Sequence, residues 1–562
     1  GPATPLHIAE GRESTVTFSV HVKDDLGAAS LAFHASAPGG ETTRRATLSV
    51  RPPVPFMTQV SSGNFTNGSA RVPLERQMYA EFRQLNATAS ALPLGLARGL
   101  DFYLKNFPHG CTEQITSAAF ARLVLADEAD FGLSRAEVNE QLEKEFATLR
   151  RRQNDQGAIG YWSAETSEET DFVSVYATHF LSEAKAAGFA PPPDILQSAL
   201  RNLQTMAARQ PRDLADARTL AYAIYVLTRE GFITTNYILN LRDYLDKQFE
   251  KLWPQDLTGV YLAGAWSMLK KDDEANRLIA AYRLGVHDKS ERTDFYQALG
   301  ADAQYLAIAT RHFPNRLKNI SAQDFQAILG PISQGDFNTL SAASAIWALK
   351  GYSQSIAGHL PEIGVVEVAR DKRETPLQLL GSGVKHAAFS PDAVALRFSA
   401  RNLLTALGVF YQVVEAGFDR ALPEKAITRG LEVYRELVDE KGSAVDHVAL
   451  GQPVTVKLTA RSLTNDGITN VALIDLLPGG FEILRDSVRG RQGATGCDYV
   501  DLREDRAVFY ATIPTTMQTI TYQIKATNRG AFVVPPPYAE SMYERGVNAR
   551  GLASKITVVD AK

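Results

Sequence analysis

DFVSVYATHFLSEAKAAGF, residues 171–189, decides the fold class of the central part of this 562-residue chain. Its apolar side chains recur at intervals of three and four residues, which is the spacing of one face of an α-helix. Gly188 and the prolines at 191–193 then supply the stop expected after a helix of about five turns. The apolar positions are Phe172, Val173, Tyr176, Ala177, Phe180, Leu181 and Ala184.

Segments of the same kind recur between residues 90 and 355, which we expect to hold about a dozen helices joined by connections of ordinary length. Repeated helical hairpins with wide apolar faces and many small residues predict an α/α toroid or a solenoid. The clearest of these segments are DARTLAYAIYVLTREGF (216–232), FYQALGADAQYLAIATRHFP (295–314) and FNTLSAASAIWALKGYS (337–353).

Strand patterns lie on both sides of the helical region. TVTFSVHV (15–22) alternates apolar and polar residues, and so does QPVTVKLTARS (452–462), as half-buried strands do. The later strands fit an antiparallel sandwich, with one helix expected at PEKAITRGLEVYRELV (423–438). The order is therefore β, then α, then β, and one β domain split by an inserted helical domain is a possible arrangement.

Composition and charge exclude several classes of function. Hydrophobic residues make up 45% and charged residues 22%, with a net charge of −4 and no long basic run, so nucleic-acid binding has no electrostatic support. No apolar run is long enough to span a membrane. The two cysteines, Cys111 and Cys497, allow at most one disulfide and no cysteine zinc site, and we expect no cofactor or metal.

Cys111 lies in NFPHGCTEQITSAAF (106–120), where Pro108 and Gly110 separate two expected helices. Residues three apart on a helix face each other, so the Cys111 thiol and the Gln114 carboxamide can meet. The unpaired N–H groups of the helix start favour a thiolate, which could attack the Gln114 carbonyl and expel ammonia. The product would be an internal thioester. A lone cysteine before a helix is otherwise usually a small buried apolar residue.

PHGCTEQITS (108–117) resembles the thioester motif of the α2-macroglobulin and complement superfamily, in the form found in its bacterial branch. NDQGAIGYWSAE (154–165) and PPPYAESMYERG (535–546) are similar to later segments of that family, so the resemblance covers nearly the whole chain. It implies five regions: 1–51, the end of a macroglobulin-like β domain; 52–88, the first part of a CUB-like domain; 89–360, an α/α-toroid thioester domain; 361–420, the second part of the CUB-like domain; and 421–562, a C-terminal macroglobulin-like β-sandwich.

The resemblance also implies a function, that of a broad-spectrum protease inhibitor and not an enzyme. In family members a protease cuts a bait region, the thioester is exposed, and a lysine amine of the protease attacks the acyl carbon, here that of Gln114, while Cys111 leaves. No bait region is recognisable, so the chain is expected to be a C-terminal fragment. No histidine lies between His179 and His287, where complement members carry one for transfer to hydroxyls, so amines are the expected nucleophiles.

A thioester must be kept from water, and aromatic and apolar side chains would do so. We expect Phe107, Tyr161 and Trp162 to line it from the helical domain, and Tyr538, Met542 and Tyr543 to cover it from the last domain. Core packing and plain loop surface are the ordinary alternatives for these side chains. Glu113 falls inside the motif, yet a first-turn carboxylate that favours the helix dipole is its preferred interpretation.

The resemblance further implies a place in the cell and partners. Members of the bacterial branch are periplasmic, often anchored to the inner membrane as lipoproteins, and serve bacterial defence. Their partners are target proteases, bound covalently through lysine amines, and for some members a peptidoglycan synthase or other periplasmic proteins.

Three other functions stay open on the residues alone. A glycan-processing toroid enzyme would use paired carboxylates, for which the cluster Asp155, Glu165, Glu168, Glu169 and Asp171 is the candidate. A cysteine hydrolase would use Cys111 with His109 as its base. A structural or adhesive module would do no chemistry, and a Cys111–Cys497 disulfide would remove the thioester altogether.

Overall fold

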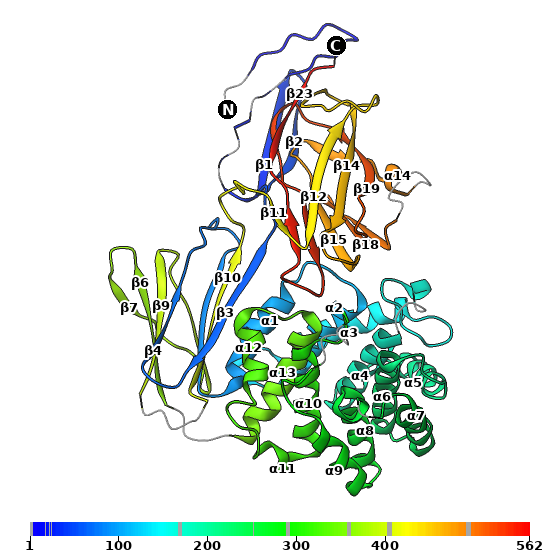
Figure 1. Cartoon of the computed structure of the whole chain (residues 1–562). Coiled ribbons are helices and arrows are strands. Elements are labelled where there is room, and N and C mark those ends of the chain that lie inside the picture. The colour runs from blue at the N-terminus through cyan, green and yellow to red at the C-terminus, as the bar shows by residue number, and fades with distance from the viewer. Residues whose placement is uncertain are drawn as a thin grey trace.

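The computed structural model describes residues 4–16, 18, 20, 21, 23, 25–166, 171–250, 252–287, 293–356, 361–401, 407–489 and 496–561. A helical region occupies one end of the molecule, and the C-terminal β-sheets stand over it at the other (Figure 1). A further pair of sheets lies beside the helices. The C-terminal strands, drawn in red, reach down to the start of α2, and this contact is where the candidate site forms.

Six inner helices form a closed ring, because each contacts the next and the last contacts the first. At least one outer helix lies between each inner helix and the next along the chain and returns the chain, so the N-termini of the inner helices gather at one end of the ring. The inner helices are α2 (Thr112–Leu125), α4 (Asp171–Ala186), α6 (Leu214–Arg229), α8 (Leu257–Met268), α10 (Ala298–His312) and α13 (Thr339–Ser355).

The remaining helices pack outside this ring or lead into it. They are η1 (Pro93–Leu96), α1 (Ala97–Lys105), η2 (Ala129–Phe131), α3 (Arg135–Arg152), η3 (Ala164–Thr166), α5 (Pro193–Ala207), α7 (Thr235–Gln248), η4 (Trp253–Gln255), α9 (Asp272–Ala281), α11 (Pro314–Leu317) and α12 (Gln326–Gln334).

The helix expected from the segment 171–189 is confirmed as α4. It ends at Ala186, and Gly188 follows with a φ of 78°, a left-handed conformation that glycine adopts at little cost. Every residue from Val173 to Ala184 is buried, because an inner helix is covered by neighbours on all sides. Burial is thus wider than the single apolar face that the spacing predicts.

Strands from before and after the helices share two antiparallel sheets. In one sheet β10 pairs with both β3 and β5, so residues around 60, 90 and 410 lie side by side, and the helices leave the sheets after β5 and return before β6. Strands from both sides of the helical region therefore pair in one sheet, as a β domain split by an inserted helical domain would require, and the bounds of such a domain stay a prediction. The first sheet holds β3 (Met57–Phe65), β10 (Val409–Gly417), β5 (Gln84–Ser90) and β8 (Val384–Ala388); the second holds β4 (Ser69–Pro73), β9 (Ala393–Arg401), β6 (Glu362–Ala369) and β7 (Glu374–Pro376).

The C-terminal region consists of three sheets around its own apolar core. Among the residues that the structure describes there, all strand pairs are antiparallel except β13 with β23. Its elements are β11 (Ile427–Arg429), β12 (Leu431–Val438), β13 (His447–Ala449), β14 (Pro453–Ser462), β15 (Ile468–Leu476), β16 (Phe481–Ile483), α14 (Arg485–Arg489), β17 (Tyr499–Leu502), β18 (Arg506–Ile513), β19 (Gln518–Ala526), β20 (Gly530–Val534), β21 (Tyr538–Ser541), β22 (Asn548–Arg550) and β23 (Ser554–Val559).

Two expectations about local structure are wrong. The helix expected over 423–438 is absent, because its residues form β11 and β12, with Leu431 and Val433 buried on one face of a sheet. The strand expected over 15–22 is not found among the described residues there, and Phe18 and Val20 are exposed. Thr17, Ser19 and Val22 lie outside the described residues.

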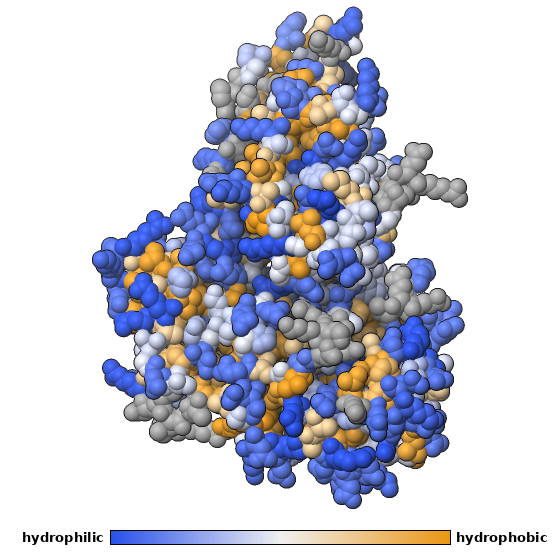
Figure 2. Space-filling view, in the orientation of Figure 1, coloured by the Kyte–Doolittle hydropathy of each residue, from blue (hydrophilic) through white to orange (hydrophobic). Residues whose placement is uncertain are grey.

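The N-terminal part forms a two-stranded antiparallel ribbon, β1 (Gly27–Ala37) with β2 (Gly40–Val50), whose side chains are mostly exposed. Figure 2 shows hydrophobic side chains on this face of the molecule as separate small groups among hydrophilic ones. Within the described residues, no helix is both long and apolar enough to cross a membrane.

Candidate functional site

Cys111 lies at the N-cap of α2, directly before the first helical residue, Thr112. Its backbone is extended, with φ −65° and ψ 165°, and its side chain is completely buried. The chain reaches this point through the segment 106–110, after α1 ends at Lys105. The helix start predicted at or just after Cys111 is therefore where the structure has it.

Cys111 and Gln114 face each other across the first turn of α2. The backbone N–H of Cys111 donates to Gln114 Oε1 at 3.1 Å, and the Cys111 side chain in turn faces the backbone N–H of Gln114, a reciprocal capping arrangement. The amide nitrogen of Gln114 points the other way, with Nε2 at 3.3 Å from Met542 Sδ. The carbonyl oxygen is thus held by a hydrogen-bond donor while the amide nitrogen is turned away from the backbone.

The thiolate expected at this helix start is contradicted by the burial of the side chain. Removal from water raises the pKa of the Cys111 thiol to about 12, and the neighbouring Glu113 carboxylate raises it further. Hydrogen bonds from Tyr161, Gln114 and Tyr543 oppose this shift without cancelling it. In this closed arrangement the desolvation of the sulfur outweighs the favourable helix N-terminus, and the thiol stays protonated near neutral pH.

Glu113 lies in the first turn of α2, as expected, but its carboxyl group is enclosed by other side chains. It is fully buried and accepts hydrogen bonds from Ser117 Oγ at 2.6 Å and from Thr339 Oγ1 at 2.8 Å. Burial raises the pKa of Glu113 to about 7, although hydrogen bonds from Ser117, Thr339 and Tyr543 lower it. A carboxyl group with this pKa can give or accept a proton at neutral pH.

The last domain closes the site with the three residues expected from the segment 535–546. Tyr543 is almost completely buried, and its hydroxyl lies 3.7 Å from Cys111 Sγ. Met542 is equally buried beside the Gln114 amide, and Tyr538, half-buried at the start of β21, packs against the same cluster. Side chains more than 400 residues apart in the sequence therefore meet around the sulfur.

Tyr161 and Trp162 approach from the helical side. The Tyr161 hydroxyl lies 2.8 Å from the Tyr543 hydroxyl, with which it shares a hydrogen bond. Trp162 stacks on Tyr499 of β17 with ring centroids 4.5 Å apart. Backbone contacts fix this loop to α2, since Thr112 N–H donates to Tyr161 O and Thr112 Oγ1 donates to Gly160 O.

Phe107 takes a different position from the other five expected shielding residues. It is half-buried, packs edge-on against Tyr103 and His109, and belongs to the neighbouring cluster of the helical core. Its link to Cys111 is therefore indirect, through the turn that carries both residues.

His109 joins the helical region to the C-terminal sheets. Its ring is buried, with Nδ1 at 3.1 Å from the Tyr510 hydroxyl and Nε2 at 2.7 Å from Glu540 Oε1. Glu540 also accepts from the Tyr538 hydroxyl. These contacts occupy both ring nitrogens, so the imidazole is committed to the interface and not aimed at Cys111.

A set of polar side chains at helix starts holds the covering loop in place. Gln297 Nε2 donates to the Tyr543 carbonyl at 2.8 Å, and Asn338 Nδ2 lies 3.4 Å from the same oxygen. Asp294 accepts from Thr469 and Asn470 of the C-terminal sheets. Sequence reading missed these residues, because glutamine, asparagine and aspartate before a helix look like ordinary caps.

Tyr510 and Phe295 complete the cluster and were also missed. Tyr510 on β18 packs against Trp162, and Phe295 packs edge-on against Tyr543. An apolar or aromatic residue on a strand or before a helix is ordinary core material, so no sequence signal distinguished them. The cluster around Cys111 comprises Tyr161, Trp162, Val173, Ala472, Ile474, Leu476, Val508, Tyr510, Met542 and Tyr543, with Phe172, Phe295 and Tyr538 partly buried against it.

The rival disulfide is not formed, and the rival carboxylate cluster lies only partly within the described residues. Cys111 and Cys497 are both free thiols, so the rival disulfide is absent. In the acidic cluster, Asp171 is paired with Arg209, while Glu168 and Glu169 lie outside the described residues. Within the described residues, no group of three or more His, Cys, Asp or Glu side chains is placed to hold a metal ion.

Comparison with known proteins identifies the family of this chain. The family model described as the bacterial α2-macroglobulin MG10 domain matches residues 430–545. The α2-macroglobulin homolog of Yersinia pestis is 36% identical over 579 residues, which cover 97% of this chain and 29% of that protein. The chain therefore spans less than a third of the length of this relative.

Two solved structures have the same fold. Native α2-macroglobulin of Escherichia coli, spanning domain MG7 to the C-terminus, matches 95% of this chain and 88% of its own, with a TM-score of 0.76 at 17% identity. Salmonella α2-macroglobulin reacted with methylamine matches 95% of this chain and 36% of its own, with a TM-score of 0.75 at 19% identity. The chain belongs to the bacterial α2-macroglobulin family.

Proposed function

We propose that this chain is the covalent-capture part of a bacterial protease inhibitor, which acts through an internal thioester between Cys111 Sγ and Gln114 Cδ. The observation that carries the proposal is the reciprocal contact of Cys111 and Gln114 inside a buried aromatic cluster that two distant regions of the chain close together. A stored acyl group needs both features, a nucleophile next to the carbonyl and the exclusion of water.

The contacts suggest how the bond forms. Cys111 Sγ attacks Gln114 Cδ, and the negative charge that develops on Oε1 is stabilised by the backbone N–H of Cys111. The Cδ–Nε2 bond then breaks, and the nitrogen leaves as ammonia after it takes up the thiol proton. One thioester and one ammonia molecule replace one thiol and one amide.

Glu113 is the group best suited to carry that proton. The Tyr543 hydroxyl lies near Cys111 Sγ and also forms a hydrogen bond with Glu113, which connects the thiol to the carboxylate. With a pKa of about 7, Glu113 can accept the thiol proton and later give it to the leaving nitrogen. This step makes up for the high pKa of the buried thiol.

Capture takes place at the same acyl carbon, Gln114 Cδ. A lysine amine of the target protease loses a proton, forms a bond from its nitrogen to Gln114 Cδ, and breaks the Cδ–Sγ bond, so that Cys111 leaves as a thiolate and takes up a proton. Amines are the proposed nucleophiles because no histidine among the described residues is placed to activate a hydroxyl, His109 being bound to Tyr510 and Glu540. The reaction with methylamine named for the Salmonella structure concerns the same kind of nucleophile.

The chain reacts once and is consumed, so it is an inhibitor and not an enzyme, which fits the family. Target proteases are its proposed covalent partners, and a periplasmic location, with lipoprotein anchoring in the whole protein, is proposed on the same family grounds. A peptidoglycan synthase as a further partner rests on the resemblance alone. The toroid and CUB-like names and the five domain boundaries are part of the same proposal.

Intact-mass measurement on freshly purified protein tests the thioester. We expect a mass lower than the sequence value by one ammonia, with one titratable thiol, that of Cys497. Methylamine should add its own mass and release a second thiol, and Cys111→Ser should abolish both effects. A full sequence mass with two free thiols would refute the proposal, whereas a mass that fits Gln114 converted to glutamate would show that the bond had formed and been hydrolysed.

A further inference from the structure

Arg152, the last residue of α3, holds the turn that carries Cys111. Its Nη2 donates to the Gly110 carbonyl at 2.8 Å, and its Nη1 donates to Thr112 Oγ1 at 2.9 Å. Nη1 also lies 3.4 Å from the Tyr161 carbonyl oxygen. The guanidinium is thus bound to the residues directly before and after the cysteine, and to the loop that shields it.

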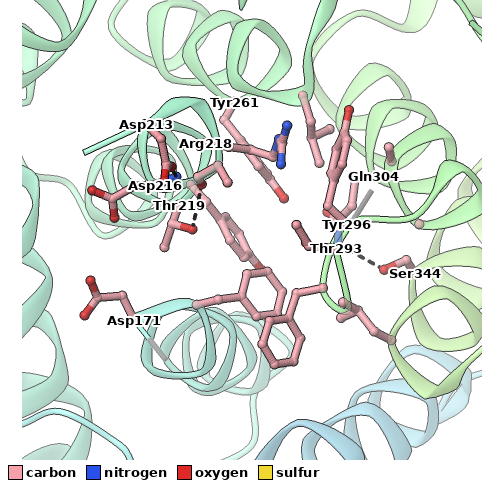
Figure 3. A pocket seen from close by; sticks show the side chains of 18 of the residues that line it. Asp171, Asp213, Asp216, Arg218, Thr219, Tyr261, Thr293, Tyr296, Gln304 and Ser344 are labelled. Carbon is pink, nitrogen blue, oxygen red and sulfur yellow. Dashed lines mark hydrogen bonds between the residues drawn. The ribbon is translucent and has the colours of Figure 1, made fainter. Parts of the chain in front are cut away.

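Several other arginines of the helical region have carboxylate partners. A cavity of about 310 Å³ opens among the inner helices, and Figure 3 shows Arg218 and Asp216 in its wall. Arg218 forms a buried ion pair with Asp256. Asp216 accepts hydrogen bonds from both Arg209 and Arg212. The positive charges around this cavity therefore already have their counter-charges.

The charge of Arg152 has no adjacent negative charge. Its three acceptors are uncharged oxygens, and within the described parts of the chain no carboxylate lies at ion-pair distance from its guanidinium. Glu145 attracts the guanidinium from further away. Burial raises the pKa of Glu145 to about 7, so this carboxyl group is only partly charged at neutral pH. A partly buried cation therefore stands beside the reacting turn without an anion next to it.

An ionised Cys111 would supply the missing negative charge. Burial lowers the pKa of Arg152, and among the surrounding charges an ionised Cys111 opposes this shift most, ahead of Glu145 and Tyr499. In the closed state this attraction does not offset the burial of the sulfur, and the thiol stays protonated. The attraction takes effect when the sulfur acquires a negative charge during a reaction.

The other ionisable side chains that face Cys111 are neutral or negative in each of their protonation states. They are Glu113, Tyr161, Tyr510 and Tyr543. The imidazole of His109 binds Glu540. Glu540, Tyr510 and Tyr543 belong to the C-terminal region and would leave with it, whereas all three acceptors of Arg152 lie in the helical region. Arg152 therefore keeps its contacts whether the site is closed or open.

We propose that Arg152 is a positioning residue for the acyl transfer, and that its positive charge stabilises the Cys111 thiolate as it leaves Gln114. The amine nitrogen bonds to Gln114 Cδ, the electron pair of the Cδ–Sγ bond stays on the sulfur, and the amine proton passes to water. Negative charge grows on Sγ during this step, so a fixed cation nearby lowers the barrier. The inference rests on the proposed thioester function.

Two substitutions separate the charge of Arg152 from its hydrogen bonds. Arg152→Lys keeps the positive charge but not the planar fork that binds two acceptors, whereas Arg152→Gln keeps a donor without the charge. The matched control Arg151→Gln removes one positive charge from an exposed side chain of the same helix. In a Cys497→Ser background, the first measurement is the rate of thiol release by methylamine. The second is the pH midpoint for alkylation of the released Cys111 thiol.

We expect Arg152→Gln to raise the alkylation midpoint by about one pH unit, a tenfold change in the ionisation constant, and to slow thiol release about three- to tenfold. Arg152→Lys and Arg151→Gln should leave the midpoint unchanged. A clamp that acts through hydrogen bonds alone would loosen in both Arg152 variants, so equal midpoints in the two, or faster release from both, would overturn the proposal.

The mass of the protein separates this inference from the thioester itself. Equal midpoints in a protein that shows the ammonia mass loss would refute the role of the charge and leave the thioester standing. A missing mass loss would instead refute the thioester. In that case the midpoints of Arg152→Lys and Arg152→Gln, measured on the free Cys111 thiol, would still confirm or refute the stabilised thiolate.

Discussion

Replacing Gln297 with leucine tests whether the contact between the helices and the covering loop controls access to Cys111. Gln297 is 9% exposed and donates to the Tyr543 carbonyl at 2.8 Å, and Asn338 reaches the same oxygen only at 3.4 Å. Leucine has nearly the same size but no donor, so the carbonyl loses its stronger partner in the closed state, whereas water can bind it in the open state. The change therefore favours opening.

The size of the effect follows from the free-energy cost of leaving a buried acceptor without its hydrogen bond, about 1–3 kcal/mol. Because 1.4 kcal/mol corresponds to a factor of ten, the open population should rise about 5- to 150-fold. The remaining contact from Asn338 places the expected value near the lower part of this range, about tenfold. If opening is in fast equilibrium, the reaction rate rises by the same factor as the open population.

The assay is the release of the Cys111 thiol by dilute methylamine, followed with a chromogenic thiol reagent. A Cys497→Ser background leaves one thiol to report, and Gln326→Leu serves as the matched glutamine control. We expect Gln297→Leu to accelerate release about tenfold with little change in the melting temperature of the helical region. An unchanged rate, or an increase explained by a general loss of stability, would refute the role given to this hydrogen bond.

Three further substitutions test other parts of the structure. Burial raises the pKa of Glu113 from an ordinary value of 4.5 to about 7. The contribution of this carboxyl group to stability is therefore present below pH 4.5 and is lost as the pH rises through 7. Glu113→Gln should flatten the pH dependence of the unfolding free energy, measured by chemical denaturation between pH 5 and pH 8, by up to about 3 kcal/mol. Arg218→Met leaves the buried Asp256 carboxylate without its partner and should destabilise the protein by about 3–5 kcal/mol in the same measurement. Gly160→Ala places a methyl group 1.8 Å from the Ser163 carbonyl oxygen, so the backbone must shift, the loop with Tyr161 should leave the cluster, and thiol release should accelerate.

Each of these predictions has an outcome that would contradict it. If Glu113→Gln left the pH dependence of the unfolding free energy unchanged, the Glu113 carboxyl group would not be held protonated. Part of that pH dependence remains in either case, because burial also raises the pKa of Glu145 to about 7. Arg150→Met breaks an exposed ion pair with Asp194 and should cost less than about 1 kcal/mol, so an equal loss from both arginine variants would refute the argument from burial. Normal thiol release in Gly160→Ala would separate this loop from the shield.

The helices and the neighbourhood of Cys111 could be read from the sequence because they depend on local patterns. The spacing of apolar residues over 171–189 predicts α4, and the spacing of Cys111 and Gln114 within one helical turn predicts their contact. By contrast, the segment 423–438 has charged residues that favour a helix, but Gly430, with a φ of 70°, separates two short strands, and pairing with β14 and β22 decides the outcome. Tertiary pairing overrides local preference here.

The parts of the site that could not be predicted depend on contacts between distant segments. No sequence pattern near Glu113 predicts that Thr339 donates to its carboxylate. The helix start alone predicts a thiolate at Cys111, whereas burial in the assembled chain raises the pKa of the thiol. The roles of Gln297 and Asn338 depend likewise on where Tyr543 comes to lie. Burial and partners at long range are properties of the assembled chain.

The distance of 432 residues between Cys111 and Tyr543 has a consequence for the order of events during synthesis. A ribosome that adds about 5–20 residues per second exposes the cysteine and the glutamine roughly 20–90 seconds before the tyrosine that covers them. During that interval the nascent chain holds the first turn of α2 but not the segment around Tyr543 that covers it. Any acyl bond made then would be exposed to hydrolysis by water. A lasting bond is therefore expected only after the segment around Tyr543 has been synthesised and has folded over α2.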